Sequence, residues 1–241
     1  MVSMEQNIRP AFTAEDATTI LSEAYAIQVQ SITELTSELD RNYYVCAADG
    51  CEYVLKIAHP SVSASILDLQ NATLKHLAET LAIVPQLEPT QDNSDTVNVV
   101  GEDQQTYSVR LLKYLPGMPL VDFKPHTPEL LQDIGSHLGQ LTQTMQSFDH
   151  AEKRLDYRWN VLNFLDIVAY ADDMPADKKQ LITYFVELYQ DIVQPEIDNL
   201  PHSFIYNDAN DYNILVQPDG LDSVKVSGMI DFGDMVYSPT I

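Results

Sequence analysis

FIYNDANDYNILVQPDGLDSVKVSGMIDFG, residues Phe204–Gly233, contains two apolar runs that flank the turn signal Pro-Asp-Gly at 218–220. The runs are Asn213–Val216 and Val224–Ile230. Together with this turn they predict a β-hairpin whose glycine takes a positive φ. Polar residues that a hairpin does not need stand at both of its ends. Because a hairpin folds back on itself, we expect these polar ends to meet.

The polar ends predict a magnesium and phosphate site. Asp208, Asn210, Asp211 and Asn213 precede the hairpin, and Asp231 follows it. Mg²⁺ prefers oxygen ligands from one or two side chains together with substrate phosphates, so we predict Asn213 and Asp231 as its ligands. Asp208 would lie across a tight loop, where it could accept a hydroxyl proton as the catalytic residue. Alternatively, Asp and Asn are ordinary turn residues, and Asp-Phe-Gly is a common tripeptide.

The order Asp-x4-Asn, hairpin, Asp-Phe-Gly is the catalytic layout of protein kinases. YNDANDYNILV followed by MIDFGDMVYSP resembles the aminoglycoside phosphotransferase and choline kinase superfamily. Within it, the chain is most similar to hydroxylysine kinase-like proteins and to the kinase-like domains of class III aminotransferase fusions. Those families usually have His-Gly-Asp where this chain has Tyr206-Asn207-Asp208. The Asp matches, whereas the His that usually supports the loop is absent.

The resemblance implies an α+β fold of the two-lobed, protein-kinase-like kind. It also implies bound ATP and Mg²⁺ and transfer of phosphate to a hydroxyl of a small molecule, for which an amino alcohol such as hydroxylysine is one candidate. The alternative is a catalytically weak kinase-like module that binds a nucleotide or a partner within a larger multidomain protein. The altered Tyr206 position is one reason to keep that alternative open.

Lys56 is the one basic residue in the apolar strand 53–58, where an ammonium group is costly unless it finds anions. Alternatively, Lys56 lies on an edge strand and faces water. The resemblance implies that Lys56 holds nucleotide phosphates and that a glutamate on the next helix, expected at about 63–81, pairs with it. Gln70, an amide, falls at that position, and the neighbouring carboxylate of Asp68 is expected on a different face of the helix.

The other nucleotide contacts are implied by the resemblance alone. The segment between the predicted strands 28–36 and 42–47 contains no glycine, so Ser37 and Asn42 are candidates for phosphate contacts. An adenine ring would dock against the backbone of a hinge near Leu112 to Leu115. Such backbone recognition leaves no side-chain signature.

We expect residues 1–113 to form an antiparallel lobe and residues 114–241 a helical lobe that carries the hairpin. The first lobe begins with a helix at 13–26 that has a capping box, and the second has helices starting at Thr127 and spanning about 160–171 and 176–200. Trp159 is expected to be a packing residue. Relatives continue beyond residue 241, which implies an incomplete C-terminal lobe. Its apolar faces at 130–145 and 176–197 would then be partly uncovered.

The composition and net charge limit the classes of molecule that could bind this chain. The chain has 241 residues and a formal net charge of −23, which disfavours nucleic acid and anionic membranes as partners. The charge reflects either a solvated acidic surface or a field that favours cationic acceptors. The sequence contains no apolar run of about 18 residues, so it predicts no membrane-spanning helix. Cys46 and Cys51 flank a predicted turn at positions unsuited to a disulfide, which indicates a cytoplasmic protein.

Overall fold

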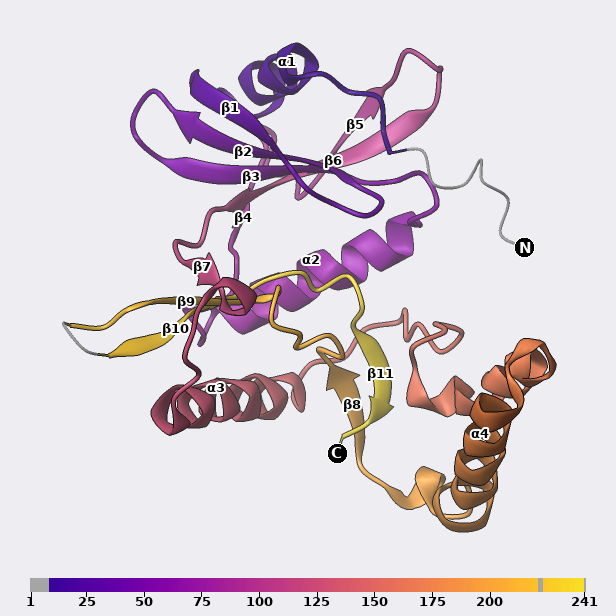
Figure 1. Ribbon diagram of the computed structural model, residues 1–241. Coiled ribbons are helices and arrows are strands. Elements are labelled where there is room, and N and C mark those ends of the chain that lie inside the picture. Colours follow the sequence, from indigo (N-terminus) through magenta and orange to yellow (C-terminus); the bar gives the residue numbers. More distant parts are fainter. Residues whose placement is uncertain (1–8, 221–222, 241) are drawn as a thin grey trace.

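The computed structural model describes residues 9–220 and 223–240. Its first part is an antiparallel sheet of six strands in the order β1-β2-β3-β6-β4, with β5 paired to β6 (Figure 1). The strands are β1 (Val29–Leu35), β2 (Arg41–Ala47), β3 (Glu52–Ile57), β4 (Leu87–Glu88), β5 (Val97–Val100) and β6 (Thr106–Lys113). The antiparallel sheet predicted for this part of the chain is confirmed.

One face of this sheet is covered by α1 (Ala14–Tyr25), which lies across it (Figure 1). The predicted capping box is present, because the Thr13 side chain accepts from the Asp16 amide and the Asp16 carboxylate accepts from the Thr13 amide. Leu21 of α1 and Leu55 of β3 are completely buried in the shared core. Since side chains alternate along a strand, Lys56 points to the opposite face.

The second helix, α2 (Ala64–Ala78), runs below the sheet and joins it to the rest of the molecule (Figure 1). Ser63 caps this helix by accepting from the Ile66 amide. Three buried leucines of α2 share one hydrophobic cluster with residues of β6, β8 and β10: Leu69, Leu74, Leu77, Leu112, Phe204 and Met229. This cluster therefore packs the sheet against the segments that flank the predicted site.

The second part of the molecule carries the predicted hairpin. β9 (Ile214–Pro218) and β10 (Val224–Met229) pair antiparallel, and β7 (Met118–Pro119) pairs with β9. Gly220 has φ 91°, as its turn position requires. β8 (His202–Ile205) pairs with β11 (Val236–Pro239), so the chain before the hairpin and the chain after it are joined a second time.

Helix α3 (Pro128–Met145) covers the hairpin. It begins as predicted, with Thr127 as the cap and Pro128 in the first turn. Its residues Leu130 and Ile134 pack with Ile214 and Val226 of the hairpin. The apolar face of 130–145, which was expected to be partly uncovered, is covered over most of its length, and its exposed residue is Leu131 at 53%.

The later helices differ from the predicted ones. Residues Val161–Asp173 form a 3₁₀ helix rather than an α-helix, with a non-helical residue at Asn163 and a cap at Asn160. Helix α4 spans Ala176–Leu188, and a π-helical turn, Tyr189–Val193, ends it before Pro195. Two short 3₁₀ helices, Leu120–Asp122 and Ile197–Asn199, complete the chain's helices within the described residues.

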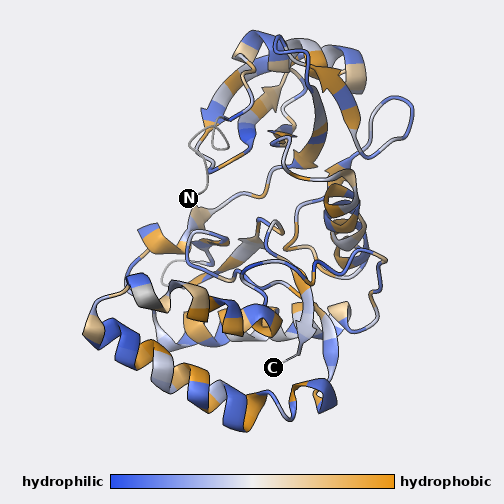
Figure 2. Cartoon of the chain, turned by 90° about the vertical axis from the view of Figure 1, so that its right-hand side faces the viewer, coloured by the Kyte–Doolittle hydropathy of each residue, from blue (hydrophilic) through white to orange (hydrophobic). Residues whose placement is uncertain are grey.

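Helix α4 buries none of its described residues and lies at the edge of the molecule (Figure 1). Hydrophobic residues recur along it, as Figure 2 shows for the long helix nearest the viewer. Those exposed on α4 are Leu181 52%, Tyr184 58%, Phe185 47% and Leu188 38%. The expectation of an uncovered apolar face is met here. In the part of the chain that the structure describes, no helix is long and apolar enough to cross a membrane.

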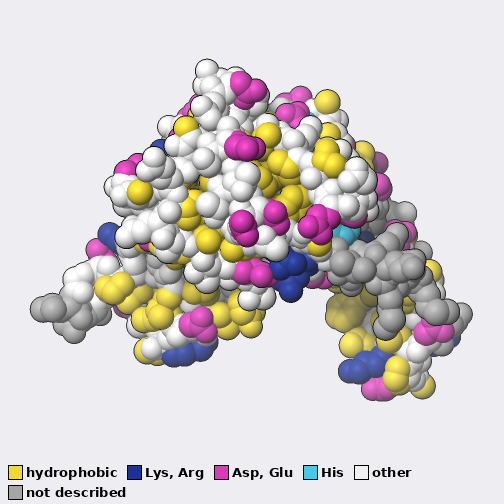
Figure 3. Space-filling model, turned by 90° about the horizontal axis from the view of Figure 1, so that it is seen from above, with side chains coloured by type: hydrophobic (Ala, Val, Ile, Leu, Met, Phe, Trp, Pro, Cys, Tyr) yellow, Lys and Arg dark blue, Asp and Glu magenta, His cyan; other side chains and the backbone are white. Residues whose placement is uncertain are grey.

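The acidic surface and the free cysteines are as the sequence predicts. Acidic side chains are spread over the face seen from above (Figure 3), as expected for a chain with 36 Asp and Glu against 13 Lys and Arg. Cys46 and Cys51 are both free thiols. Because β6 ends at Lys113 and β7 already pairs with β9, we keep the boundary between the lobes at residues 113 and 114 as a proposal.

Candidate active site

The loop after β8 holds Asp208 through two neighbouring amides. Asn213 Nδ2 donates to Asp208 Oδ2 at 2.8 Å, and Asn210 Nδ2 donates to Asp208 Oδ1 at 2.8 Å. The Asn210 side-chain oxygen in turn accepts from the backbone amides of Tyr212 and Asn213. Asn and Asp form such local turns readily because their short side chains reach the nearby backbone. The half-buried Asp208 carboxylate is therefore fixed in direction before any ligand binds.

Asp231 returns to this loop because the hairpin is closed at its base. The Ile230 amide donates to the Asn213 carbonyl at 2.9 Å, so the two ends of the hairpin are adjacent. Asp231 itself has φ 58°, a left-handed conformation that is uncommon outside glycine, and its Oδ1 accepts from the Gly233 amide at 3.0 Å. The structure thus brings together the two segments that carry Asp208, Asn213 and Asp231.

Tyr206 and Asn207 brace the loop where relatives usually have His-Gly. The buried Tyr206 hydroxyl donates to the Ile230 carbonyl, directly before Asp231. Asn207 has φ 67°, and its Nδ2 donates to the Asp234 carbonyl at 3.1 Å. Both side chains therefore tie the segment before Asp208 to the segment around Asp231. Burial, followed by the charges of Asp231, Asp208 and Asp234, raises the pKa of Tyr206, so its hydroxyl keeps the donated proton.

Lys56 acts electrostatically on Asp231. Asp231 is open to solvent, and the positive charge of Lys56 is the main cause that holds the pKa of its carboxyl below the usual range. Partial desolvation opposes this shift, and the Gly233 amide and Arg110 reinforce it. The Asp231 carboxylate is therefore ionised, as a ligand of a cation must be.

Three polar residues form a row across adjacent strands on the face away from α1. Lys56 is the Cα partner of Asn42 on one side and of Arg110 on the other. Directly opposite residues in an antiparallel pair project to the same face. Asn42 therefore lies beside the predicted phosphate-binding lysine. Its side-chain oxygen is buried and has no hydrogen-bond partner among the described residues.

Gln70 does not pair with Lys56. Its Oε1 accepts from Arg110 Nη2 at 2.5 Å, and the next residue, Asn71, accepts from Arg110 Nη1 through Oδ1 at 2.7 Å. Asp68 lies on another face of α2, as predicted. It is exposed and contacts His150. Sequence reasoning missed Arg110, although an arginine in the apolar strand YSVRLLKY was as visible as Lys56.

The remaining predicted nucleotide contacts lie near this row or at the linker between the two parts. Ser37 is half-buried in the loop between β1 and β2. Leu112 is buried in β6, and Leu115 lies two residues beyond the end of that strand, where it packs close to Gly228 of β10. The amides of Lys113 and Tyr114 donate to Gln86 and Glu52, so the sheet already uses these two hinge donors.

A hollow of about 370 Å³ opens beside Asp208. Trp159, Asn207, Asp208 and Asp234 line it. The prediction that Trp159 is a packing residue is wrong, because its side chain is 61% exposed. The reason is local: the Asn160 side chain caps the following 3₁₀ helix and is itself buried, and this leaves the preceding ring outside the core. Arg158 lies 5.0 Å from the centroid of the Trp159 ring.

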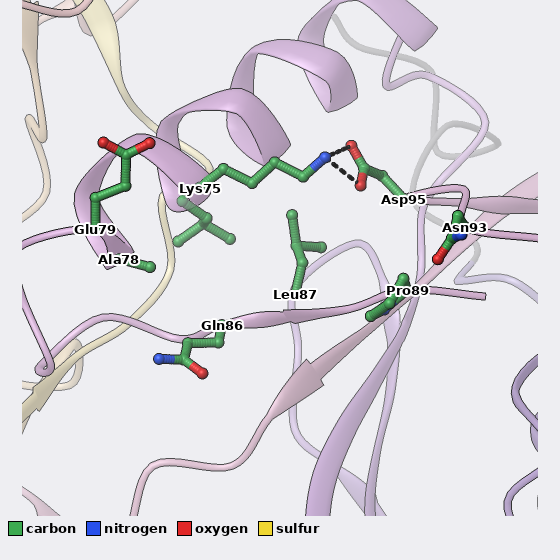
Figure 4. Close-up of a pocket in the computed structure, with 9 residues that line it drawn as sticks. Lys75, Ala78, Glu79, Gln86, Leu87, Pro89, Asn93 and Asp95 are labelled. Atoms are coloured by element: carbon green, nitrogen blue, oxygen red, sulfur yellow. Dashed lines mark hydrogen bonds and ion pairs between the residues drawn. The ribbon is translucent and has the colours of Figure 1, made fainter. Parts of the chain in front are cut away.

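Four further hollows among the described residues hold none of the predicted catalytic or metal-binding residues. One, of about 420 Å³, lies between α2 and β4, where the ammonium of Lys75 pairs with Asp95 Oδ1 at 2.5 Å (Figure 4). Another, of about 400 Å³, is apolar and lies at the strands of the hairpin sheet, beside Met118 and Val216. The described residues contain no cluster of three or more His, Cys, Asp or Glu side chains that could hold a metal.

Comparison with known proteins places this geometry in context. The chain is 30% identical over 254 residues to a hydroxylysine kinase of Xenopus laevis, with 96% of this chain and 67% of that protein covered. It is 28% identical over 237 residues to a hydroxylysine kinase of Danio rerio, with 94% and 66% covered. The chain thus spans about two thirds of the length of these curated relatives.

A solved structure shares the fold. The amicoumacin kinase hAmiN, in complex with AMP-PNP, Ca²⁺ and Ami, matches with a TM-score of 0.71 at 17% identity, covering 95% of this chain and 66% of that one. The model of the phosphotransferase enzyme family matches residues 31–241, which include the sheet, the Asp208 loop and the hairpin. This protein is therefore a member of the phosphotransferase enzyme family.

Proposed function

We propose that the protein transfers the terminal phosphate of ATP, with Mg²⁺, to a hydroxyl group of a small amino alcohol such as hydroxylysine. The observation that carries the proposal is the closed hairpin base, where the loop of Asp208 and Asn213 meets Asp231, on whose carboxyl the charge of Lys56 acts. Family membership and the hydroxylysine kinases among the relatives support the same reaction class.

Asp208 has the role of orienting the acceptor hydroxyl and accepting its proton. The amides of Asn213 and Asn210 each donate to one of its carboxylate oxygens, which restricts rotation of the carboxylate. A carboxylate that is held in one orientation loses less freedom when the acceptor binds, and such positioning is a large part of catalysis of phosphate transfer.

The donor set fits Mg²⁺. Because the Asn213 amide nitrogen donates to Asp208, the other end of this amide, its carbonyl oxygen, remains for a cation. Asp231 uses Oδ1 for the Gly233 amide, and Oδ2 remains on the same ionised carboxylate. Two such oxygens together with phosphate oxygens match the usual surroundings of Mg²⁺. When bound, the ion would neutralise charge on the phosphates.

The nucleotide would lie along the row of Asn42, Lys56 and Arg110, with its phosphates toward Asp231. Lys56 would bind phosphate oxygens, and Ser37 lies in the adjoining loop. The unpaired side-chain oxygen of Asn42 suits a hydroxyl donor better than a phosphate, because an amide oxygen and a phosphate oxygen are both hydrogen-bond acceptors. At the hinge, the Leu115 amide is the donor we assign to adenine, since the sheet uses the amides of Lys113 and Tyr114.

The acceptor would enter the hollow beside Asp208. A cationic amine suits this hollow, because Asp208 and Asp234 supply negative charge and the exposed Trp159 ring supplies an aromatic face. The Tyr157 hydroxyl donates to Asp234 Oδ1 and fixes that carboxylate. The overall charge of −23 favours the approach of a cation as well.

The test is a screen of hydroxylated amines with ATP and Mg²⁺, with product detected by mass spectrometry, on this chain and on its Asp231→Asn variant. Transfer to at least one amine, lost in the variant, is the expected result. The second candidate, a nucleotide-binding module with weak catalysis, is favoured by the amide at Gln70, which cannot form the usual ion pair with Lys56. Mg²⁺-dependent binding of AMP-PNP without transfer to any amine would select it.

A further inference from the structure

A buried arginine lies beside the lysine of the proposed phosphate site. Arg110 is 6% exposed, and the two amides that receive its hydrogen bonds, Gln70 and Asn71, are 6% and 2% exposed. All three side chains are thus inside the protein, between β6 and α2. A guanidinium held by two side chains of a helix through separate nitrogens has a fixed position and direction.

The positive charge of Arg110 has no direct counter-charge. No carboxylate of the described residues forms an ion pair with it, and the amides that hold it are neutral. A buried charge usually requires a charged partner. The acidic groups that act on it electrostatically are Asp40 and Asp231, and Asp40 uses Oδ1 to accept from the His59 amide at 3.0 Å.

Arg110 and Lys56 are direct neighbours on one face of the sheet. Like charges in opposite positions of an antiparallel pair repel each other. Arg110 is fixed by two amides of α2, whereas no hydrogen bond or ion pair joins Lys56 to α2 among the described residues. Repulsion between the two charges would therefore direct the Lys56 ammonium away from Arg110 and toward Asp231, on whose carboxyl the Lys56 charge acts.

We propose that Arg110, held by Gln70 and Asn71, is a positioning residue for the nucleotide's phosphates. Its fixed positive charge orients Lys56 by repulsion, where a helix carboxylate would do so by attraction, and α2 then presents no carboxylate that competes with the phosphate oxygens for the lysine. This inference rests on the proposed function, because it requires that a nucleotide binds along this row.

A change at Gln70 separates this role from the usual lysine–glutamate arrangement. Gln70→Glu keeps the size of the side chain and introduces a carboxylate beside Arg110. If a helix carboxylate were what Lys56 needs, this variant would bind a nucleotide triphosphate more tightly. If Arg110 supplies charge to the site, neutralising it weakens binding, and we expect about a tenfold loss, the change produced by one modest charge interaction.

The experiment measures binding of AMP-PNP with Mg²⁺ by calorimetry and of adenosine, which has no phosphates, by ligand-detected NMR. The variants are Arg110→Met, Arg110→Lys and Gln70→Glu, with Gln132→Glu on the exposed side of α3 as a control for the added negative charge. We expect Arg110→Met and Gln70→Glu to weaken AMP-PNP about tenfold. Adenosine binding should stay unchanged, Arg110→Lys should recover part of the AMP-PNP affinity because it keeps the charge but not both amide contacts, and Gln132→Glu should match the original chain.

Several results would overturn the inference. Equal losses for AMP-PNP and adenosine in Arg110→Met would mean that the residue only supports the fold. Tighter AMP-PNP binding by Gln70→Glu would mean that the lysine needs a carboxylate. If Arg110→Met does not unfold cooperatively, Gln70→Glu and Arg110→Lys decide the matter. Failure of the unaltered chain to bind AMP-PNP would instead refute the proposed function, on which this inference depends.

Discussion

Replacing Tyr206 with phenylalanine tests whether this residue braces the catalytic loop in place of the usual histidine. The ring is 5% exposed and packs 4.8 Å from the Phe232 ring, so phenylalanine fills the same space. The change removes only the hydroxyl that donates to the Ile230 carbonyl. Losing one buried hydrogen bond and leaving its acceptor unpaired costs about 1–2 kcal/mol.

A loss of that size lowers the melting temperature by about 2–8 °C for a chain of this length. We expect differential scanning calorimetry to show this decrease for Tyr206→Phe. The matched control is Tyr184→Phe on α4, where the ring is 58% exposed and the same deletion should change stability by less than about 0.5 kcal/mol. Equal melting temperatures for Tyr206→Phe and the unaltered chain would refute the bracing role. Tyr206→His should recover part of the loss if a donor at this place is what matters.

Three further predictions concern the metal ligand, the acceptor hollow and α4. Since the pKa of Asp231 is lowered in the folded protein, its ionised form persists below the usual pKa of about 3.9, and the contribution of that charge is lost only as the pH falls through the lowered value. Mg²⁺-dependent AMP-PNP binding should therefore survive at pH 5. Lys56→Met should raise the pH at which this binding is lost on acidification, and an unchanged pH of loss would contradict the role of Lys56. Trp159→Ala should raise the KM for a cationic acceptor about tenfold and leave the melting temperature within about 2 °C, because the ring is 61% exposed; a large loss of stability would instead indicate packing. Light scattering should detect self-association through α4, and the double change Leu181→Glu with Phe185→Glu should abolish it; a monomer before the change would contradict this prediction.

Local sequence signals predicted most of the fold. The hairpin was predicted from two apolar runs around Pro-Asp-Gly, and the starts of α1 and α3 were predicted from Thr13 and Thr127 as N-terminal caps. These features depend on residues close together in the chain. The 3₁₀ helix at 161–173 was not predicted, because its geometry is set by the cap at Asn160 and by the contact of that side chain with the Tyr237 carbonyl, far along the sequence.

The candidate site was predictable where residues of one short segment meet. Asp208 and Asn213 share a loop, and the hairpin returns Asp231 to it, so all three could be proposed from spacing alone. The role of Arg110 depends on the register of β3 against β6 and on the face that α2 presents, which spacing within one segment does not encode. Trp159 was misjudged because an apolar ring was assumed to be buried, whereas the packing of Asn160 decided its position.

The most direct test of the central claim compares the unaltered chain with Asp208→Asn in two assays. Binding of AMP-PNP with Mg²⁺ is measured by calorimetry, and transfer of phosphate from ATP to an amino alcohol is followed in a single turnover. We predict that the variant binds the nucleotide within about threefold of the unaltered chain and transfers phosphate at least about 100-fold more slowly, because it lacks the carboxylate that accepts the hydroxyl proton. Equal transfer rates for the two chains would contradict the assignment of Asp208, and binding without transfer in the unaltered chain would select the nucleotide-binding module instead.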